Sequence, residues 1–220
     1  MAMTILLGAF VVLLLLGVPV AFALAVSALA TLLFLDLPSI VLVQQISAGS
    51  GAVSLIAIPL FIFAGELMLR GGISERLIGF ASALVGRVRG GLGQVSVLSS
   101  LFFGGVSGSA LADVSAVGGT MIPQMIKRGY DRDYAVNVCM TAALVALLVP
   151  PSHNLILFSA AAGGGISITD LFAAGIMPAL LMTVAMMITG YAVARHRGYG
   201  TEPFPGWQAV FLRFIGALPG

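Results

Sequence analysis

The fold is decided by a glycine-rich stretch near the middle of the chain, Gly104-Gly105-Val106-Ser107-Gly108-Ser109-Ala110-Leu111-Ala112-Asp113. Around it, residues 90–126 carry one charged side chain, that of Asp113. Two full membrane crossings need about 40 apolar residues plus a turn, whereas one crossing needs about 20. If Arg89 and Lys127 lie on the same side of a membrane, the segment predicts a re-entrant hairpin. Each limb would be about 13 residues long, and the tip would lie at residues 106–110.

Composition places the whole chain in a membrane. Of its 220 residues, 60% are hydrophobic, and the charged residues are only ten Lys plus Arg and eight Asp plus Glu. A water-soluble domain has roughly 25% charged residues. Five stretches carry no charge and exceed the length of about 20 residues that crosses a bilayer. They are residues 1–35, 37–65, 90–112, 134–169 and 171–194. The sequence therefore predicts an all-α protein with several membrane helices.

Several other classes of protein are excluded by what the sequence lacks. The lone Cys139 cannot form an internal disulfide, and His153 and His196 do not provide the ligand spacing of a zinc site. The net charge of +2 comes from basic residues near segment ends rather than from one clustered basic face. We therefore expect no nucleic-acid partner, no bound cofactor and no metal chemistry of the zinc type.

A second interruption is predicted inside the stretch 134–169, at Val149-Pro150-Pro151-Ser152-His153-Asn154. Each proline lacks an amide donor, so the carbonyls of Ala146 and Leu147 lose their usual helical partners. The residue before a proline is also driven away from helical backbone angles. The sequence therefore predicts a discontinuous helix whose break lies at 149–154.

Basic residues predict the orientation of the chain. They occur in three clusters: Arg70, Arg76, Arg87 and Arg89; Lys127, Arg128 and Arg132; and Arg195 and Arg197. Basic residues are enriched on the cytoplasmic side of membrane proteins, so the three clusters should share that side. Residues 73–89 also have helical amphipathic spacing, which fits either a solvated connector or a rigid arm along the membrane surface.

Two interruptions within the membrane are typical of the binding site of a secondary transporter. Carbonyls at helix ends carry partial negative charge and can replace the water shell of a cation such as sodium. The hydroxyls of Ser107, Ser109 and Ser152 and the amide oxygen of Asn154 would add neutral ligands. The second limb, which should begin near Ser109, would turn its amide donors toward the same region and attract a carboxylate.

At this point the chain resembles a known family, the large permease subunit of tripartite ATP-independent periplasmic (TRAP) transporters. The resemblance covers nearly the whole chain, and the two interrupted segments are its most specific parts. It lies in Gly17-Val18-Pro19-Val20-Ala21-Phe22-Ala23, Ile58-Pro59-Leu60-Phe61-Ile62-Phe63-Ala64-Gly65-Glu66-Leu67-Met68, Gly104 to Asp113, and Pro150-Pro151-Ser152-His153-Asn154.

The resemblance implies a sodium-driven elevator transporter in the bacterial inner membrane that imports organic-acid anions such as C4-dicarboxylates. It implies two protein partners, a small four-helix permease subunit and a periplasmic solute-binding protein, besides membrane lipid. Sodium would be the coupling ion, and the chain would not be an enzyme. The cation site of the family maps onto Ser107, Gly108, Ser109 and Ala110 and onto Pro150, Ser152 and Asn154, with Ser109, Asp113 and His153 binding or supporting the substrate.

The charge pattern and the resemblance together predict five parts: scaffold membrane helices at 1–70, an amphipathic arm at 71–90, the hairpin at 91–126, transport-domain helices at 127–197, and a linker with the start of a second repeat at 198–220. This is the first half of the inverted-repeat fold of an ion transporter. We expect the remaining half either to be missing from a truncated reading frame or to be a separate chain.

Individual polar residues also have simpler interpretations. Asp113 supports the cation site or caps the second limb, and His153 contacts the substrate or is a hydrogen-bonded structural group. Glu66 should pair with Arg70 four residues later. Asp36 and Asp170 lie at segment ends and are expected to be caps, Asp170 together with Thr169.

Two other functions are alternatives to transport. Gly105-Val106-Ser107-Gly108 superficially matches the nucleophile turn of rhomboid-type intramembrane proteases, with His153 as a possible base. Catalysis would need Ser107 and His153 within about 2.6 to 3.2 Å of each other, and four-residue matches occur by chance. The second alternative is an assembly subunit without transport activity, which the missing half favours.

Overall fold

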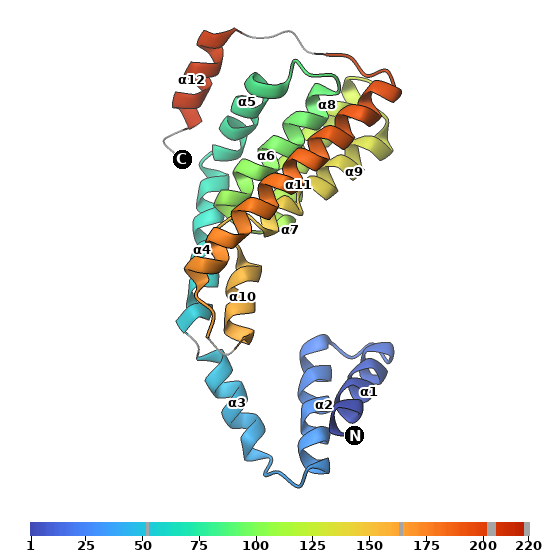
Figure 1. Ribbon diagram of the computed structural model, residues 1–220, viewed down its shortest axis with the longest axis vertical. Helices are drawn as coiled ribbons and strands as arrows, with labels where there is room; N and C mark the ends of the chain where they lie inside the picture. The colour runs from blue at the N-terminus through green and yellow to red at the C-terminus, as the bar shows by residue number, and fades with distance from the viewer. Residues whose placement is uncertain (52, 163–164, 202–205, 218–220) are drawn as a thin grey trace. The chain divides into compact units, whose positions relative to one another are not determined.

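The computed structural model describes residues 1–51, 53–162, 165–201 and 206–217, and within them it contains helices, turns and bends but no strand (Figure 1). The helices are α1 (Ala2–Leu15), α2 (Val20–Phe34), α3 (Ile40–Ser50), α4 (Val53–Arg70), α5 (Ile73–Val85), α6 (Gly91–Ser107), α7 (Ala110–Asp113), α8 (Gly119–Lys127), α9 (Arg132–Ala142), α10 (His153–Ala161), α11 (Ile168–His196) and α12 (Trp207–Ala217). The prediction of an all-helical protein is confirmed for these residues. Residues 202–205 and 218–220, part of the predicted linker and second repeat, lie outside the described ranges.

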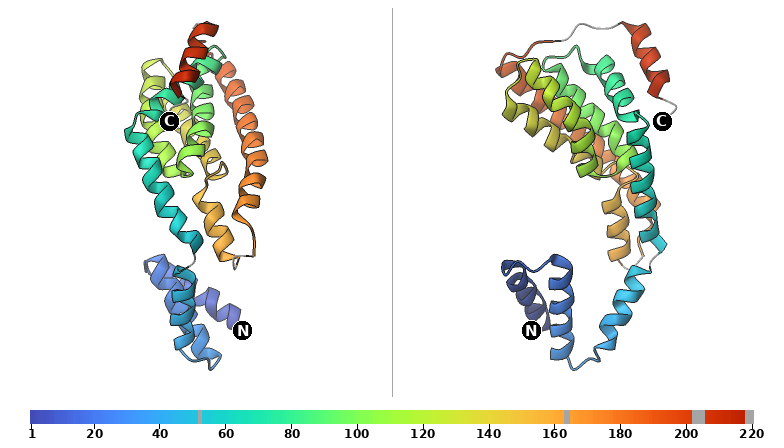
Figure 2. Two further views of the ribbon diagram at one scale, coloured as in Figure 1. Left: turned by 90° about the vertical axis from the view of Figure 1, so that its left-hand side faces the viewer. Right: turned by 180° about the vertical axis from the view of Figure 1, so that it is seen from behind.

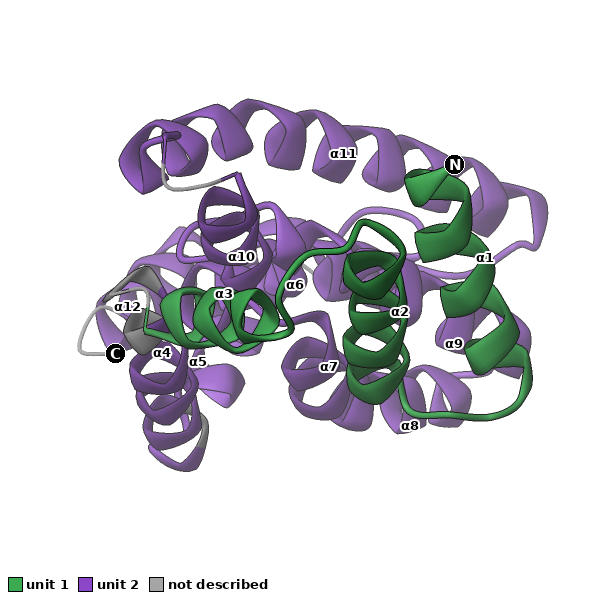
Figure 3. Cartoon of the chain, turned by 90° about the horizontal axis from the view of Figure 1, so that it is seen from below, with its two compact units in different colours: residues 1–53 green, residues 54–220 purple. Residues whose placement is uncertain are grey.

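The chain forms two compact units, residues 1–53 (unit 1) and 54–220 (unit 2) (Figure 3). In unit 1, α1 and α2 pack against each other. Gly17, with a φ of 79°, makes the turn between them, and Pro19 precedes the first residue of α2. Residues 1–35 therefore contain two helices rather than one bent helix. Asp36 lies just after α2 with a φ of 52°, and the amides of Asp36 and Leu37 donate to the carbonyls of Leu33 and Leu32, so the cap predicted at Asp36 is present at the C-terminal end of this helix.

The hairpin forms the centre of unit 2. Helix α6 ends at Ser107, Gly108 adopts a φ of 56°, and Ser109 is extended. The chain then returns through α7, a π-helical segment at Val114–Gly118, and α8, all of which contact α6. The predicted turn is confirmed, but α6 has 17 residues and is longer than the limb expected from the sequence. The placement of this hairpin as re-entrant in a membrane stays a prediction.

The predicted break in the following helix is present. Helix α9 ends at Ala142, a short 3₁₀ turn covers Val145–Leu147, and α10 begins at His153. The carbonyl oxygen of Leu147 is not left free, because the Ser152 hydroxyl donates a hydrogen bond to it at 2.5 Å. The side chain of Ser152 thus replaces the backbone donor that the prolines remove.

Helix α11 is the longest in the chain and lies along α6 and α9 (Figure 2). Within the described residues it is the one helix long and apolar enough to cross a membrane by length and composition, since the other apolar helices are shorter. Its cap is Ser167, whose Oγ accepts a hydrogen bond from the Asp170 amide, so the cap predicted at Thr169 and Asp170 is wrong. In α4, which contains Pro59, the predicted pair of Glu66 and Arg70 is confirmed at 3.0 Å.

Helix α5 packs between α6 and α12. Ile78 and Ala81 are buried, and the ring of Phe80 lies 5.5 Å from that of Phe102 on α6 and 5.4 Å from that of Phe214 on α12. The apolar face of α5 is therefore directed toward protein. The role of this helix as an arm on a membrane surface stays a prediction.

Charged residues at the start of α9 and after the end of α11 lie together. The Arg197 guanidinium after α11 donates hydrogen bonds to Asp131 at 2.8 Å and to Asp133 at 2.9 Å, before and within the first turn of α9. The Tyr199 hydroxyl donates to Asp131 at 2.8 Å, and its ring lies 4.3 Å from that of Tyr130. This group of contacts, which we call the terminal clamp, joins the start of α9 to the end of α11.

The terminal clamp should be sensitive to acid. The hydrogen bond from Arg197 holds the pKa of the Asp133 carboxyl below its ordinary value. A carboxylate with a lowered pKa stabilises the fold above its unfolded-state pKa, and this stabilisation is lost as the pH falls through the folded-state pKa. We expect Asp133→Asn to lower the Tm in detergent at pH 7, by an amount that shrinks as the pH is lowered toward about 3. The control is Glu66→Gln, which removes an isolated exposed pair and should barely change Tm. If the Tm of Asp133→Asn falls below that of the parent chain by the same amount at pH 7 and at a pH of about 3, the Asp133 carboxylate does not stabilise the clamp in this way.

Candidate functional site

The two interruptions of helical winding are in direct contact. A Cβ atom built on Gly108 at the hairpin tip would overlap the carbonyl oxygen of Pro151 and lie 3.1 Å from the Cα of Ser152. One turn earlier in α6, a Cβ on Gly104 would lie 2.7 Å from the Cα of Ala146. These distances are shorter than side chains allow, so both positions require glycine. The sequence predicted each interruption separately, and the structure brings them together.

A third segment completes the junction. Gly65 of α4 is buried, and a Cβ on it would lie 3.6 Å from the Cα of Ser107. Sequence reasoning missed this contact, although Gly65 lies in one of the stretches that carry the family resemblance. The signal that could have found it is the pair of small residues Ala64 and Gly65 in an apolar helix, because small residues let membrane helices approach closely.

A pocket of about 370 Å³ opens beside the tip. Its polar side chains are Ser107, Ser109, Ser115, Glu66 and His153, and its apolar walls include Ile62 and Phe103. Ser115 and Glu66 were not among the residues expected at the site. A pocket with several hydroxyl groups and one histidine in an apolar surround can hold a small polar ligand.

Ser107 and Ser109 shape the tip through weak hydrogen bonds. The Ser107 hydroxyl donates to the Ser109 carbonyl at 3.5 Å and accepts from the Ser109 amide at 3.4 Å. The Ser109 hydroxyl accepts from the Ala112 amide at 3.5 Å and so caps the return limb, which begins near Ser109 as expected. Bonds of this length are easily exchanged for a stronger partner, and a hydroxyl oxygen carries two lone pairs. Both serine oxygens can therefore ligate a cation.

The remaining predicted residues fall into two groups. Ser152 is fully buried beside Gly108, and Pro150 and Ala110 are half-buried in the junction segments. Asn154 is exposed and does not line the pocket. The structure therefore brings together the predicted serines and the proline break, but it does not place Asn154 with them.

Asp113 joins the two limbs of the hairpin. It is 1% exposed, and its Oδ2 accepts a hydrogen bond from the Ser100 hydroxyl of α6 at 2.6 Å. Its Oδ1 has no hydrogen-bond partner among the described residues, and Asp113 does not line the pocket. The cap of the return limb is Ser109 rather than Asp113. Ser100 was missed because α6 contains four serines, and the sequence does not reveal which of them faces Asp113.

His153 lines the pocket together with Ser107, and its Nε2 is buried without a hydrogen-bond partner in the described part of the chain. No hydrogen bond joins Ser107 and His153 there, and the Ser107 hydroxyl donates instead to the Ser109 carbonyl. A hydrolase mechanism would need the histidine to take the proton of this serine. The arrangement in the structure does not provide that contact.

Comparison with known proteins finds one family over most of the chain. The profile of the DctM component of the tripartite ATP-independent periplasmic transporter matches residues 7–212.

A putative TRAP transporter large permease protein of Haemophilus influenzae is 43% identical over 187 residues, 84% of this chain and 43% of that protein. The C4-dicarboxylate TRAP transporter large permease protein DctM of Vibrio cholerae is 38% identical over 194 residues, 87% of this chain and 42% of its own. The ectoine large permease protein TeaC of Halomonas elongata is 38% identical over 211 residues, 94% of this chain and 49% of its own. The chain spans about half the length of the curated relatives that it matches.

The contact at the junction predicts that two glycines with left-handed backbone angles lose different amounts of stability when each is replaced by alanine. Gly108 has a φ of 56° and lies against Pro151, whereas Gly129 has a φ of 82° with no atom within 4 Å of a built Cβ. Alanine at either position costs about 1 to 2 kcal/mol in backbone strain. Gly108→Ala should cost about 1 to 3 kcal/mol more, because the junction must move to admit the methyl group. Unfolding of the purified chain in detergent measures both variants. Equal losses of stability would show that the two interruptions are not in contact.

Proposed function

Since this chain belongs to the DctM family of TRAP transporter permease components, we propose that it supplies part of the transport path of a sodium-coupled importer of organic-acid anions. The observation that carries this proposal is the contact of Gly108 with Pro151 and Ser152. It supports a single site at which two interrupted helices present their free ends. Transport by the complete protein, its substrates and its partners are all part of the proposal.

Sodium would bind where the tip and the break meet. The C-terminal end of α6 carries partial negative charge from its last carbonyl groups. The hydroxyls of Ser107, Ser109 and Ser152 add neutral oxygens, and we include the backbone of Gly108, Ala110 and Pro150 in the same site. Neutral oxygens that replace a hydration shell suit an ion that must bind and leave in every transport cycle. Asn154, being exposed, would contribute only after a rearrangement.

The substrate anion would occupy the pocket beside the tip. Ser109 begins the return limb, whose first amide groups favour a carboxylate, and His153 adds a nitrogen with no other partner among the described residues. Asp113 would act indirectly by holding the limbs together through Ser100. Names of relatives include C4-dicarboxylate, sialic acid, 2,3-diketo-L-gulonate and ectoine permeases, and each of these compounds carries a carboxyl group. An organic acid, such as a C4-dicarboxylate, is therefore the substrate class that we propose.

The family is one of membrane proteins, and we propose a multi-pass location in the bacterial inner membrane. The gathering of Lys127, Arg132 and Arg197 at one end of unit 2 supports a cytoplasmic position for that end. The hairpin would then be re-entrant from the cytoplasmic side. We further propose that α5 connects a scaffold at 1–70 to a transport domain that moves as an elevator, with a small four-helix subunit and a periplasmic solute-binding protein as partners.

Sodium binding provides the first test. Ser109→Leu removes one ligand oxygen and fills the space beside the tip, so it should weaken sodium binding to the purified chain at least tenfold, equivalent to about 1.4 kcal/mol. Titration calorimetry in detergent with choline as the replacement cation measures the change. Ser50→Leu, on the exposed end of α3, is the matched control and should bind like the parent chain. If Ser109→Leu binds sodium as tightly as Ser50→Leu, the proposed cation site is wrong.

A further inference from the structure

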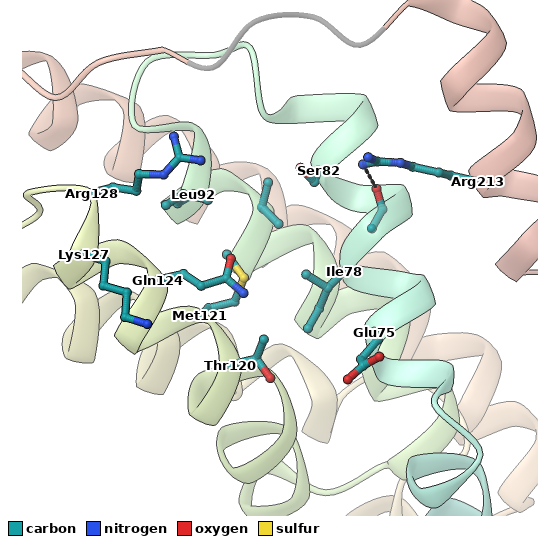
Figure 4. A pocket seen from close by; sticks show the side chains of 12 residues that line it. Glu75, Ile78, Ser82, Leu92, Thr120, Met121, Gln124, Lys127, Arg128 and Arg213 are labelled. Atoms are coloured by element: carbon teal, nitrogen blue, oxygen red, sulfur yellow. Dashed lines mark hydrogen bonds between the residues drawn. The ribbon is translucent and has the colours of Figure 1, made fainter.

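A second pocket lies at the base of the hairpin, away from the tip. Its volume is about 490 Å³, and it is lined by residues of α5, α6, α8 and α12 (Figure 4). Leu92 near the start of α6 and Lys127 at the end of α8 both line it, so it marks the point where the two limbs begin and end. None of the residues expected to bind sodium or substrate takes part in it.

The pocket combines cationic and apolar groups. Lys127 and Arg213 project toward the pocket from opposite sides, and Glu75 lies on a third side (Figure 4). Arg128 also lines the pocket. The apolar part is formed by Ile78, Leu92, Val95 and Met121, of which Val95 and Met121 are almost completely buried. A water-soluble anion would gain nothing from this apolar wall, whereas an amphipathic anion would use both parts.

The two cations are available to a ligand. The Arg213 guanidinium donates from Nη1 to the carbonyl oxygen of Gly79 at 2.9 Å, which fixes its direction over the pocket. Its other N–H groups remain for further bonds, because a guanidinium has five donors. Lys127 is exposed and forms no ion pair with a carboxylate in the described ranges.

We propose that this pocket binds a membrane phospholipid, with its phosphate at Lys127, its headgroup directed toward Arg213 and the start of an acyl chain against Ile78 and Leu92. Lys127, Arg128 and Arg213 all line the pocket, and basic side chains near a membrane surface attract anionic headgroups. The lipid would connect α5 and α12 to the base of the hairpin. This proposal rests on the membrane location of the family but not on the sodium site at the tip.

The test measures lipid binding to the purified chain in detergent by native mass spectrometry. Phosphatidylglycerol should bind with one high-affinity site. Removing one cation near a membrane surface costs about 1 kcal/mol, so Lys127→Gln should weaken that binding about fivefold, and Lys127→Gln with Arg213→Gln about 25-fold. Because Lys127 is exposed, its replacement should leave the Tm of the chain unchanged.

The matched control is Arg132→Gln. Arg132 is an exposed basic residue in the first turn of α9 and does not line the pocket, so its loss should leave lipid binding unchanged. Inorganic phosphate and glycerophosphoglycerol test the source of the phosphate, and both should bind at least tenfold more weakly than the intact lipid. Equal effects of Lys127→Gln and Arg132→Gln would overturn the site. Binding of inorganic phosphate as tight as that of phosphatidylglycerol would overturn the assignment to a lipid. Neither result would bear on sodium binding at the tip.

Discussion

A peptide group that leaves helical winding in a bilayer must find its hydrogen-bond partners within the protein, because hydrocarbon offers none. In the structure the two interruptions lie against each other, and the hydrogen bonds that satisfy their peptide groups are made within each segment. The Gly108 amide still donates to the Gly104 carbonyl, Ser109 caps the return limb, and the Ser152 hydroxyl satisfies the Leu147 carbonyl. The close approach of Gly108 to Pro151 is possible only without a side chain. The sodium site that we propose uses the oxygens that this arrangement leaves within reach.

The two ends of the hairpin have different chemistry. The tip is lined by hydroxyls in an apolar surround, and its one negatively charged neighbour in the pocket is Glu66, which is paired with Arg70. The base carries cations and is flanked by the terminal clamp of Arg197 with Asp131 and Asp133. Neutral oxygens suit reversible binding of an ion, and fixed charges suit attachment to headgroups and to the ends of neighbouring helices. This division agrees with a hairpin that is anchored at its base and that binds and releases an ion at its tip.

Local sequence rules were sufficient for the interruptions but not for their partners. Proline removes a donor and glycine admits a left-handed backbone wherever they occur, so the break at Pro150 and the turn at Gly108 could be predicted. The pairing of Glu66 with Arg70 follows from helical spacing in the same way. The bond of Ser100 to Asp113, the approach of Gly65 to Ser107 and the bonds of Arg197 to α9 join residues from different elements. Such contacts depend on how the helices pack against one another, and local rules applied to a single sequence do not predict that packing. Asn154 shows the converse, since its neighbours in sequence belong to the junction while its own side chain is exposed.

Contact between the two interruptions can be measured most directly by disulfide formation. A Cβ on Gly105 would lie 3.6 Å from Cγ1 of Val149, and a cysteine at 149 would place its sulfur at this γ position, within reach of a sulfur carried by that Cβ. In a Cys139→Ala background, Gly105→Cys with Val149→Cys should form an intramolecular disulfide on mild oxidation in native membranes, detected by peptide mass spectrometry. Gly105→Cys with Leu157→Cys, on the exposed side of α10, should not. If the first pair stays reduced while each single cysteine reacts with a thiol reagent, the tip and the break do not meet and the site described here does not exist.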